Sequence, residues 1–212
     1  MRIVIFGANG PVGKILTQRT LDAGHHVTAV TRHTGAFPIR RTGLDVVAGD
    51  VLVAADVARA VAGQDVVLSL FGVPYSFKPI DVYSRGTANI LQAMQQAGVK
   101  RLVCTTSGGT RPHYDPEEGF VFGRIIKPIV GRTLYADMRR MEEIVMKSDR
   151  DWTIVRPAEL VDTPAVTPYR VAEGYLVSGL RKTSRADLAD FLLAQATSDL
   201  HLHKAVAVGT AP

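Results

Sequence analysis

The stretch that most constrains this chain is Arg2 to Gly13, which reads R-I-V-I-F-G-A-N-G-P-V-G. The four consecutive apolar residues from Ile3 to Phe6 are typical of a strand buried on both faces of a parallel sheet. Three glycines follow, and Pro11 comes after the second. Proline suits the first turn of a helix because the N–H that it lacks would be unpaired there. The pattern therefore predicts a strand, a tight glycine turn and a helix.

This arrangement suits the binding of a phosphate, because the first N–H groups of a helix lack partners and its dipole is positive at that end. In a dinucleotide fingerprint Gly7 permits the turn, Gly10 lets the backbone approach the ligand, and Gly13 lets the helix pack close to the strand. The alternative is that the glycines only form a turn. The strand and helix on either side favour a dinucleotide site.

Predicted strands and helices alternate along the chain, which indicates a Rossmann-type, doubly wound parallel sheet flanked by helices. We expect one domain over residues 1–212, with substrate elements at the carboxyl ends of the strands. Further strands are expected at His26–Thr31, Leu44–Ala48, Val66–Phe71, Arg101–Thr105, Trp152–Arg156 and Ala205–Val208, and a short strand or hairpin at Val171–Val177. Further helices are expected at Asp56–Ala62, Asp81–Ala97, Thr133–Met146 and Asp187–Ala196, the last capped by Ser184.

The connection from Gly108 to Arg132 is rich in glycine and proline, which interrupt its apolar patch from Phe120 to Val130. We therefore expect no long helix in it. Long connections in compact domains are often lids or substrate loops.

Composition excludes several classes of protein. The chain has 212 residues, of which 46% are hydrophobic and 21% charged, as in ordinary globular proteins. No apolar run approaches the roughly 20 residues that cross a bilayer, and no signal peptide precedes the first strand, so we expect no membrane partner. Cys104 is the only cysteine and ends a predicted buried strand, so we interpret it as a core residue. Without internal disulfides, a reducing, cytoplasmic location is expected.

The net charge of +5 favours an anionic partner, and a phosphorylated cofactor or an acidic small substrate would account for it equally well. The basic residues are scattered, so nucleic acid is not the expected partner. His201 and His203 have no carboxylate or cysteine at metal-ligand spacing, and we expect no metal site. Neither a Walker A lysine nor a G-x-S-x-G elbow is present.

The residue after the second predicted strand distinguishes two cofactors. An acidic residue there would bind the ribose 2′-OH of NAD, whereas an arginine accommodates the 2′-phosphate of NADP. This chain has Arg32 and no carboxylate between Val27 and Leu44. The alternative is a solvated surface arginine. The pattern predicts NADP(H).

Other unusual residues follow the ends of later strands. Asp50 could accept a hydrogen bond from the adenine amino group, with Val51 against the ring, or it could cap the next helix. Gly72 follows the fourth strand, where the backbone would pass near the cofactor. Ser107 follows the fifth strand and could donate to a substrate carbonyl, or it could simply form a turn. Open α/β sheets bind ligands at this edge.

Several segments together resemble the atypical short-chain dehydrogenase/reductase family (NAD(P)H-binding, NmrA-like), and within it the biliverdin-IXβ reductase/flavin reductase branch. They are G-A-N-G-P-V-G, A-V-T-R, G-D-V-L-V-A-A-D-V, A-V-A-G-Q-D-V-V and C-T-T-S, with V-R-P-A-E-L and T-S-R-A-D-L-A later. The similarity is dense from Met1 to about Ser107 and resumes at the two later segments. It is loose between Ser107 and V-R-P-A-E-L, and again from Thr163 to Lys182.

The resemblance implies an NADP-binding monomer that passes hydride to flavins or tetrapyrroles. The cofactor residues that it implies are Gly7, Ala8, Asn9, Gly10, Val12 and Gly13 for the pyrophosphate, Arg32 for the 2′-phosphate, Asp50 and Val51 for adenine, Phe71 and Gly72 for the cofactor edge, and Pro157 to Leu160 for the nicotinamide side. It places Ser107, the candidate catalytic residue, beside the substrate.

The chain departs from this family at positions expected to take part in the reaction. Glu159 and Met138 occupy positions where the reductase has histidines. The Tyr-x-x-x-Lys pair of short-chain dehydrogenases is absent, since Tyr135 and Arg139 have the spacing but are one residue out of register, and Arg is too basic for the role. We expect an NADPH-dependent reductase. Two alternatives stay open: a non-catalytic NADP(H)-binding sensor or regulator, and an epimerase or isomerase acting on a nucleotide-linked substrate, which the missing pair disfavours.

Overall fold

The chain folds around one large sheet in the computed structural model, which describes residues 1–211. The strand order is β3-β2-β1-β4-β5-β6-β10-β8, and all neighbours are parallel except β8, which is antiparallel to β10. The strands are β1 Arg2–Phe6, β2 His26–Thr31, β3 Leu44–Ala48, β4 Val66–Ser69, β5 Arg101–Thr105, β6 Asp151–Pro157, β8 Tyr169–Glu173 and β10 Lys204–Thr210. A separate small sheet pairs β7 (Glu159–Val161) with β9 (Lys182–Ser184).

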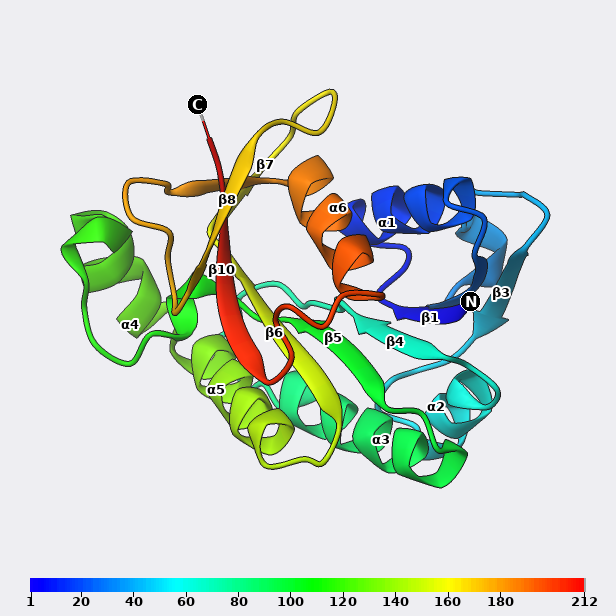
Figure 1. Ribbon diagram of the computed structural model, residues 1–212. Coiled ribbons are helices and arrows are strands. Elements are labelled where there is room, and N and C mark those ends of the chain that lie inside the picture. Colours follow the sequence, from blue (N-terminus) through cyan, green and yellow to red (C-terminus); the bar gives the residue numbers. More distant parts are fainter. Residues whose placement is uncertain (212) are drawn as a thin grey trace.

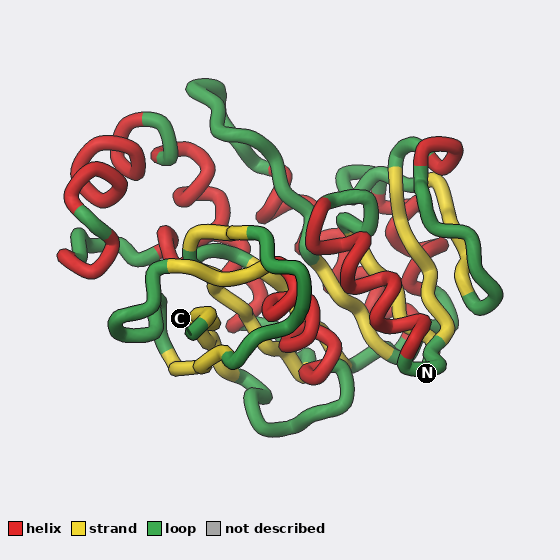
Figure 2. Tube along the Cα trace, turned by 90° about the horizontal axis from the view of Figure 1, so that it is seen from above, coloured by secondary structure: helices red, strands yellow, loops and turns green. Residues whose placement is uncertain are grey.

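Helices cover both faces of the sheet (Figure 1). One face carries α1 (Pro11–Asp22) and α6 (Arg185–Gln195), and the other carries α2 (Ala54–Val61), α3 (Val82–Ala97) and α5 (Arg132–Met146). From above, Figure 2 shows helices lying across the row of strands. Among residues 1–211, no helix combines the length and the apolar character needed to span a bilayer. The prediction of a Rossmann-type α/β sheet is confirmed.

Strand β1 shows why an unbroken apolar run belongs here. Val4 and Phe6 pack into the core beneath α2, α3 and α5, whereas Ile3 and Ile5 pack into the core beneath α1 and α6. All four side chains are at most 2% exposed. Cys104 at the end of β5 is likewise fully buried, as expected for a core residue, and burial raises the pKa of its thiol.

Several boundaries differ from the sequence prediction by one or two residues. Helix α2 begins at Ala54, and β4 ends at Ser69 because the chain then bends to meet the turn after β1. Strand β6 includes Pro157, which pairs with Val208 at the last position of the ladder. The predicted strand or hairpin at Val171–Val177 corresponds to strand β8, which begins two residues earlier and ends four residues earlier.

The connection before α5 is built of short helical elements. It holds three short elements, η2 (Gly108–Thr110), η3 (Pro116–Glu118) and the π-helix η4 (Phe122–Ile126), followed by α4 (Lys127–Ile129). Helical backbone runs from Phe120 to Ile129, but it is divided between the five-residue η4 and the three-residue α4, so the connection holds no long helix, as expected. Gly123 does not break it because the glycine packs under the ring of Tyr114, where a Cβ would lie 2.6 Å from a ring carbon. Pro128 lies at the start of α4. One further short element, η1 (Thr34–Ala36), follows β2.

Candidate functional site

The turn after β1 requires its glycines for separate steric reasons. Gly7 has a φ of +86°, and a Cβ there would lie 2.6–2.7 Å from the backbone of Leu70 and Phe71. A Cβ on Gly13 would lie 2.2 Å from the carbonyl oxygen of Gly7. The N–H of Gly10 donates to that same oxygen at 3.0 Å. The turn is therefore packed backbone against backbone, which lets a ligand approach it closely.

Helix α1 begins at this turn without a side-chain cap, and its first turn holds no acidic residue. Its first N–H groups are thus available to an anion. Ala8 and Val12 are buried beneath the turn. The side-chain oxygen of Asn9 is buried and has no hydrogen-bond partner within residues 1–211. An unpaired buried acceptor fits a ligand that brings a hydroxyl or amide donor, and a nicotinamide dinucleotide carries both.

The turn lies where the strand order reverses, between β1 and β4, and open α/β sheets bind their ligands at such a point. Phe71 borders it, and its ring stacks on Tyr83 with centroids 5.9 Å apart. The hydroxyl of Tyr83 accepts a hydrogen bond from the N–H of Val73 at 3.2 Å. Gly72 is exposed between them. The structure thus brings Phe71 and Gly72 to the glycine turn.

Arg32 lies at the end of β2, the neighbour of β1, and its side chain is exposed. Thr31 accepts a hydrogen bond from the N–H of His33 at 3.3 Å across this position. None of the ion pairs within residues 1–211 involves Arg32. Its guanidinium is therefore available to a phosphate at the edge of the glycine turn.

Asp50 closes a turn after β3 and does not cap α2, whose N-cap is Val53. Its carboxylate accepts from the N–H of Leu52 at 2.9 Å. The carbonyl of Val51 accepts from the side-chain amide of Asn89 on α3 at 2.9 Å. The helix comes this close because α3 has Gly86 at the contact, where a Cβ would lie 2.8 Å from Val51. Sequence reasoning missed both α3 residues, although a glycine inside a helix is a signal of close packing.

Ser107 follows β5, and its hydroxyl accepts from the N–H of Gly109 at 3.1 Å. Ser107 therefore forms a turn, which was one of the two roles that the sequence allowed. Tyr135 of α5 lies under this turn, since a Cβ on Gly109 would lie 2.5 Å from its ring. The phenol is hydrogen-bonded to that of Tyr75 at 2.8 Å. Burial raises the pKa of Tyr135, Tyr75 acts in the same direction, and Ser107 acts in the opposite one.

A buried ion pair supports the Ser107 turn from below. Glu142 and Arg156 are 5% and 4% exposed and share two hydrogen bonds, of 2.9 and 2.8 Å. Glu142 also accepts from the hydroxyls of Thr106 at 2.6 Å and Thr110 at 3.2 Å, which flank Ser107. Sequence reasoning missed this network. Its signal was an arginine inside a buried strand, which requires a partner.

The nicotinamide-side residues follow Arg156. Its guanidinium also donates to the carbonyl of Gly174 at 3.0 Å. Pro157 is buried at the end of β6, and Glu159 and Leu160 are exposed on β7. Met138, in place of a family histidine, is buried in α5. The roles of Pro157 and Leu160 toward a cofactor remain predictions.

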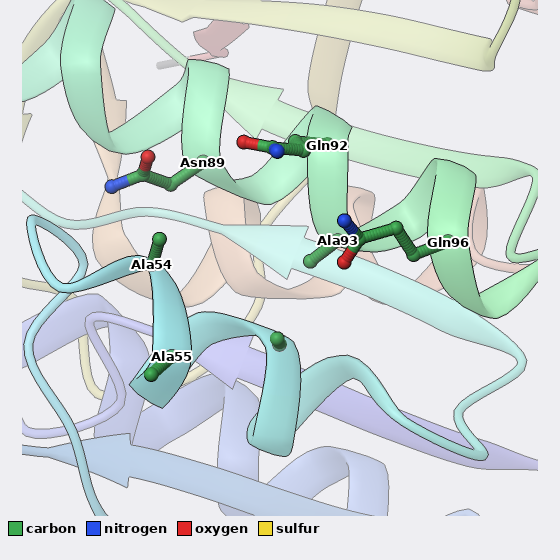
Figure 3. Close-up of a pocket in the computed structure, with 7 residues that line it drawn as sticks. Ala54, Ala55, Asn89, Gln92, Ala93 and Gln96 are labelled. Carbon is green, nitrogen blue, oxygen red and sulfur yellow. The ribbon is translucent and has the colours of Figure 1, made fainter.

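A cavity of about 220 Å³ lies elsewhere, between α2 and α3. Figure 3 shows its lining, which consists of alanines and side-chain amides: Ala54, Ala55, Ala58, Asn89, Gln92, Ala93 and Gln96. It includes no residue of the glycine turn or of the Ser107 turn. We therefore place the candidate site at the carboxyl ends of the strands and not in this cavity.

Known proteins resemble parts or all of the chain. An uncharacterized protein of Mycobacterium tuberculosis is 38% identical over 109 residues, which are 51% of this chain and 12% of that protein. A 3-beta-hydroxysteroid dehydrogenase of Mycolicibacterium neoaurum is 33% identical over 117 residues, 50% of this chain and 32% of the enzyme. The chain thus spans less than a third of the length of these two relatives.

Solved structures match the whole fold. A candidate epimerase from Bacteroides thetaiotaomicron is 25% identical with a TM-score of 0.80, covering 100% of this chain and 97% of its own. A short-chain dehydrogenase/reductase from Veillonella parvula, in complex with NADP, is 18% identical with a TM-score of 0.80. The match covers 98% of this chain and 94% of the Veillonella chain. These likenesses show that the chain has a Rossmann fold.

A family model described as NAD(P)H-binding matches residues 7–199, from the first glycine of the turn to a position between α6 and β10. The match confirms the cofactor prediction at the level of the nicotinamide dinucleotides. A particular closeness to biliverdin reductase does not follow from it. By its fold, its glycine turn and this match, the chain belongs to the NAD(P)H-binding family.

Proposed function

We propose that this chain is an NADPH-dependent reductase that passes hydride to a flavin-like or other planar conjugated acceptor. Arg32 is the observation that carries the choice of NADPH, because it is an exposed cation beside the glycine turn with no acidic neighbour in its loop. In this proposal the turn from Gly7 to Gly13 holds the pyrophosphate and Arg32 holds the 2′-phosphate. Bound NADPH would supply the hydride.

The residues expected beside the acceptor favour a reaction that needs little proton transfer from the protein. Tyr135 is a poor acid near neutral pH because burial raises its pKa, and its hydroxyl is already bonded to Tyr75. Arg139 cannot replace the lysine of short-chain dehydrogenases. Ser107 offers a hydroxyl that can orient an acceptor carbonyl but is itself weakly acidic. Orientation of two planar ring systems would then supply most of the rate.

The cofactor half of the proposal is tested by Arg32→Ala. Loss of a charge-assisted contact of about 1.5–3 kcal/mol should weaken NADPH binding roughly 10- to 100-fold and leave NADH binding unchanged. Titration with both cofactors, followed by cofactor fluorescence, measures this. Arg170→Ala, an exposed arginine of β8, is the matched control and should bind both cofactors normally. Equal losses for NADPH and NADH would show that Arg32 does not contact the 2′-phosphate.

The reductase half is tested by oxidation of NADPH in the presence of FMN or dichlorophenolindophenol. Turnover with either acceptor supports it. Tight NADPH binding without turnover across a broad acceptor panel would instead support a redox sensor, the alternative that buried Met138 and hydrogen-bonded Tyr135 favour. An epimerase would require a positioned acid–base pair, which neither Tyr135 nor Arg139 supplies.

A further inference from the structure

Exposed large apolar side chains gather in one region of this molecule. Phe77 is 79% exposed, and the helical segment from Phe120 to Ile129 contributes four more side chains of 46–68%. These four, Phe120, Val121, Ile125 and Ile129, are called the apolar face below. In Figure 1 the helix α4, which ends this segment, stands at the outer edge of the molecule. Monomeric proteins rarely expose such a cluster without a binding role.

The helical backbone from Phe120 to Ile129 creates this face. Exposure along the segment repeats every four residues, so that two rows face solvent: Phe120, Arg124 and Pro128 in one, Val121, Ile125 and Ile129 in the other. Residues four apart lie on the same face of a helix, one above the other. Arg124 is the only polar side chain in the two rows. An ordinary surface helix places its polar residues there.

The opposite side of the segment is firmly packed, so the face is not a loosely folded loop. Phe122 meets the ring of Tyr135 edge-on at 6.1 Å. The ammonium of Lys127 contacts both carboxylate oxygens of Glu118, at 2.8 and 3.0 Å, and the two side chains are 10% and 2% exposed. The anchoring residues thus hold the apolar face toward solvent.

Basic side chains accompany the face. Arg124 and Arg132 are exposed, and the sequence from Gly119 to Ala136 contains no acidic residue. Exposed Lys78 follows Phe77 in the loop after β4. That loop is attached to the start of α5, since the hydroxyl of Thr133 donates to the carbonyl of Ser76 at 2.9 Å. A row of apolar side chains with a cationic rim is typical of helices that lie in a membrane interface.

We propose that the apolar face docks this protein on the surface of an anionic lipid bilayer. Acidic headgroups would neutralise Arg124, Arg132 and Lys78 while the face enters the boundary of the acyl chains. A second copy of the chain fits less well, because a two-fold interface would bring two copies of the same basic, acid-free surface together, with no acidic side chain from Gly119 to Ala136 to pair with Arg124 and Arg132. The expectation of no membrane partner rested on spanning helices, and this mode of binding needs none. The proposal does not depend on reductase activity.

Vesicle co-sedimentation tests it. The protein should sediment with vesicles of phosphatidylcholine and phosphatidylglycerol, less with phosphatidylcholine alone, and less as salt is raised. The double variant Ile125→Gln/Ile129→Gln should lose at least about tenfold in affinity, since burying one such side chain is worth about 1.5–3 kcal/mol. Leu200→Gln, at a 73% exposed leucine outside the segment, is the matched control and should bind normally. NADPH binding by both variants shows that they are folded.

A fluorescent variant provides a second readout. Trp152 is the only tryptophan and is 7% exposed, so it gives a constant background. Phe120→Trp should shift its emission to shorter wavelength on anionic vesicles. Unchanged vesicle binding by the double variant would overturn the proposal. A second outcome would also overturn it: the unmodified protein is a dimer in light scattering, the double variant is a monomer, and neither binds vesicles. The face would then contact a second copy.

Discussion

At Gly13 a single added methyl group has no free space. A Cβ there would lie 2.2 Å from the carbonyl oxygen of Gly7 and 2.7 Å from that of Ala8, and backbone atoms cannot move aside as a flexible side chain can. Gly13→Ala should therefore push α1 away from the turn, cost about 1–3 kcal/mol in the free energy of unfolding, and weaken NADPH binding. Urea unfolding and NADPH titration measure the two effects.

Gly35→Ala is the matched control for this substitution. Gly35 lies in the loop after β2 with no atom within 4 Å of its added Cβ. Stability and NADPH binding should stay close to those of the unmodified protein. If Gly13→Ala also behaved like the unmodified protein, the close approach of α1 to the turn would not be needed for cofactor binding.

Single residues were predictable where their identity itself restricts the backbone or the ligand. Gly7 and Gly13 are examples, because only glycine fits their positions, and Arg32 is conspicuous because its loop lacks an acid. The pairing of Tyr75 with Tyr135 could not be predicted in this way. A tyrosine satisfies its hydroxyl with many partners, and the partner here comes from a loop 60 residues away.

The buried pair of Glu142 and Arg156 joins α5 to β6 and both to the Ser107 turn. Glu142→Gln would leave the guanidinium of Arg156 charged and unpaired in the interior. Breaking a buried pair from one side typically costs about 3–5 kcal/mol, so the urea midpoint should fall sharply. Glu143→Gln, at the exposed neighbouring position on α5, should change stability very little.

A double variant separates the charge from the packing. In Glu142→Leu/Arg156→Met both charges are gone, and stability should recover relative to Glu142→Gln because no buried charge is left unpaired. No recovery would mean that the hydrogen bonds from Thr106 and Thr110, more than the charge balance, stabilise this region.

Regular elements were predictable to the extent that their side chains follow a regular period. The strands from β1 to β5 read as apolar runs, and Ser184 caps α6 as expected by accepting from the N–H of Asp187 at 2.9 Å. In the segment from Phe120 to Ile129, glycine and proline indicated that no long helix would form, and the structure has a five-residue π-helix and the three-residue α4 there. The π turn itself could not be predicted from the spacing of its side chains. Strands β7 and β9 span three residues each, too short to show any period.

For the molecule as a whole, Asp187 ties distant parts of the chain together. Burial acts to raise its pKa, but hydrogen bonds from the backbone and hydroxyl of Thr167 and the hydroxyls of Thr210 and Ser184 outweigh this, so the pKa is lowered. A lowered folded-state pKa contributes stability above the unfolded value of about 3.9, and that stability is lost as the pH falls through the folded value.

Unfolding by urea between about pH 7 and pH 3 tests this contribution. The protein should lose stability below about pH 4, and Asp187→Asn should be less stable at pH 7 with a flatter acid profile. Asp45→Asn, at an exposed position of β3, should keep the profile of the unmodified protein. Parallel profiles for Asp187→Asn and the unmodified protein would show that another carboxylate controls acid unfolding.

The doubly wound parallel sheet was predictable from the alternation of strands and helices, whereas the antiparallel β8 at its edge was not. Strand β8 pairs with β10 alone, and β10 lies between β6 and β8. Since β8 ends at Glu173 and β10 begins at Lys204, a ribosome releases the edge strand well before the strand that holds it. During synthesis the half from β1 to β5 can assemble early, whereas the edge of β6 that pairs with β10 stays unpaired until β10 has been made. Nascent chains stalled after residue 203 should therefore be the species that chaperones retain and proteases cut.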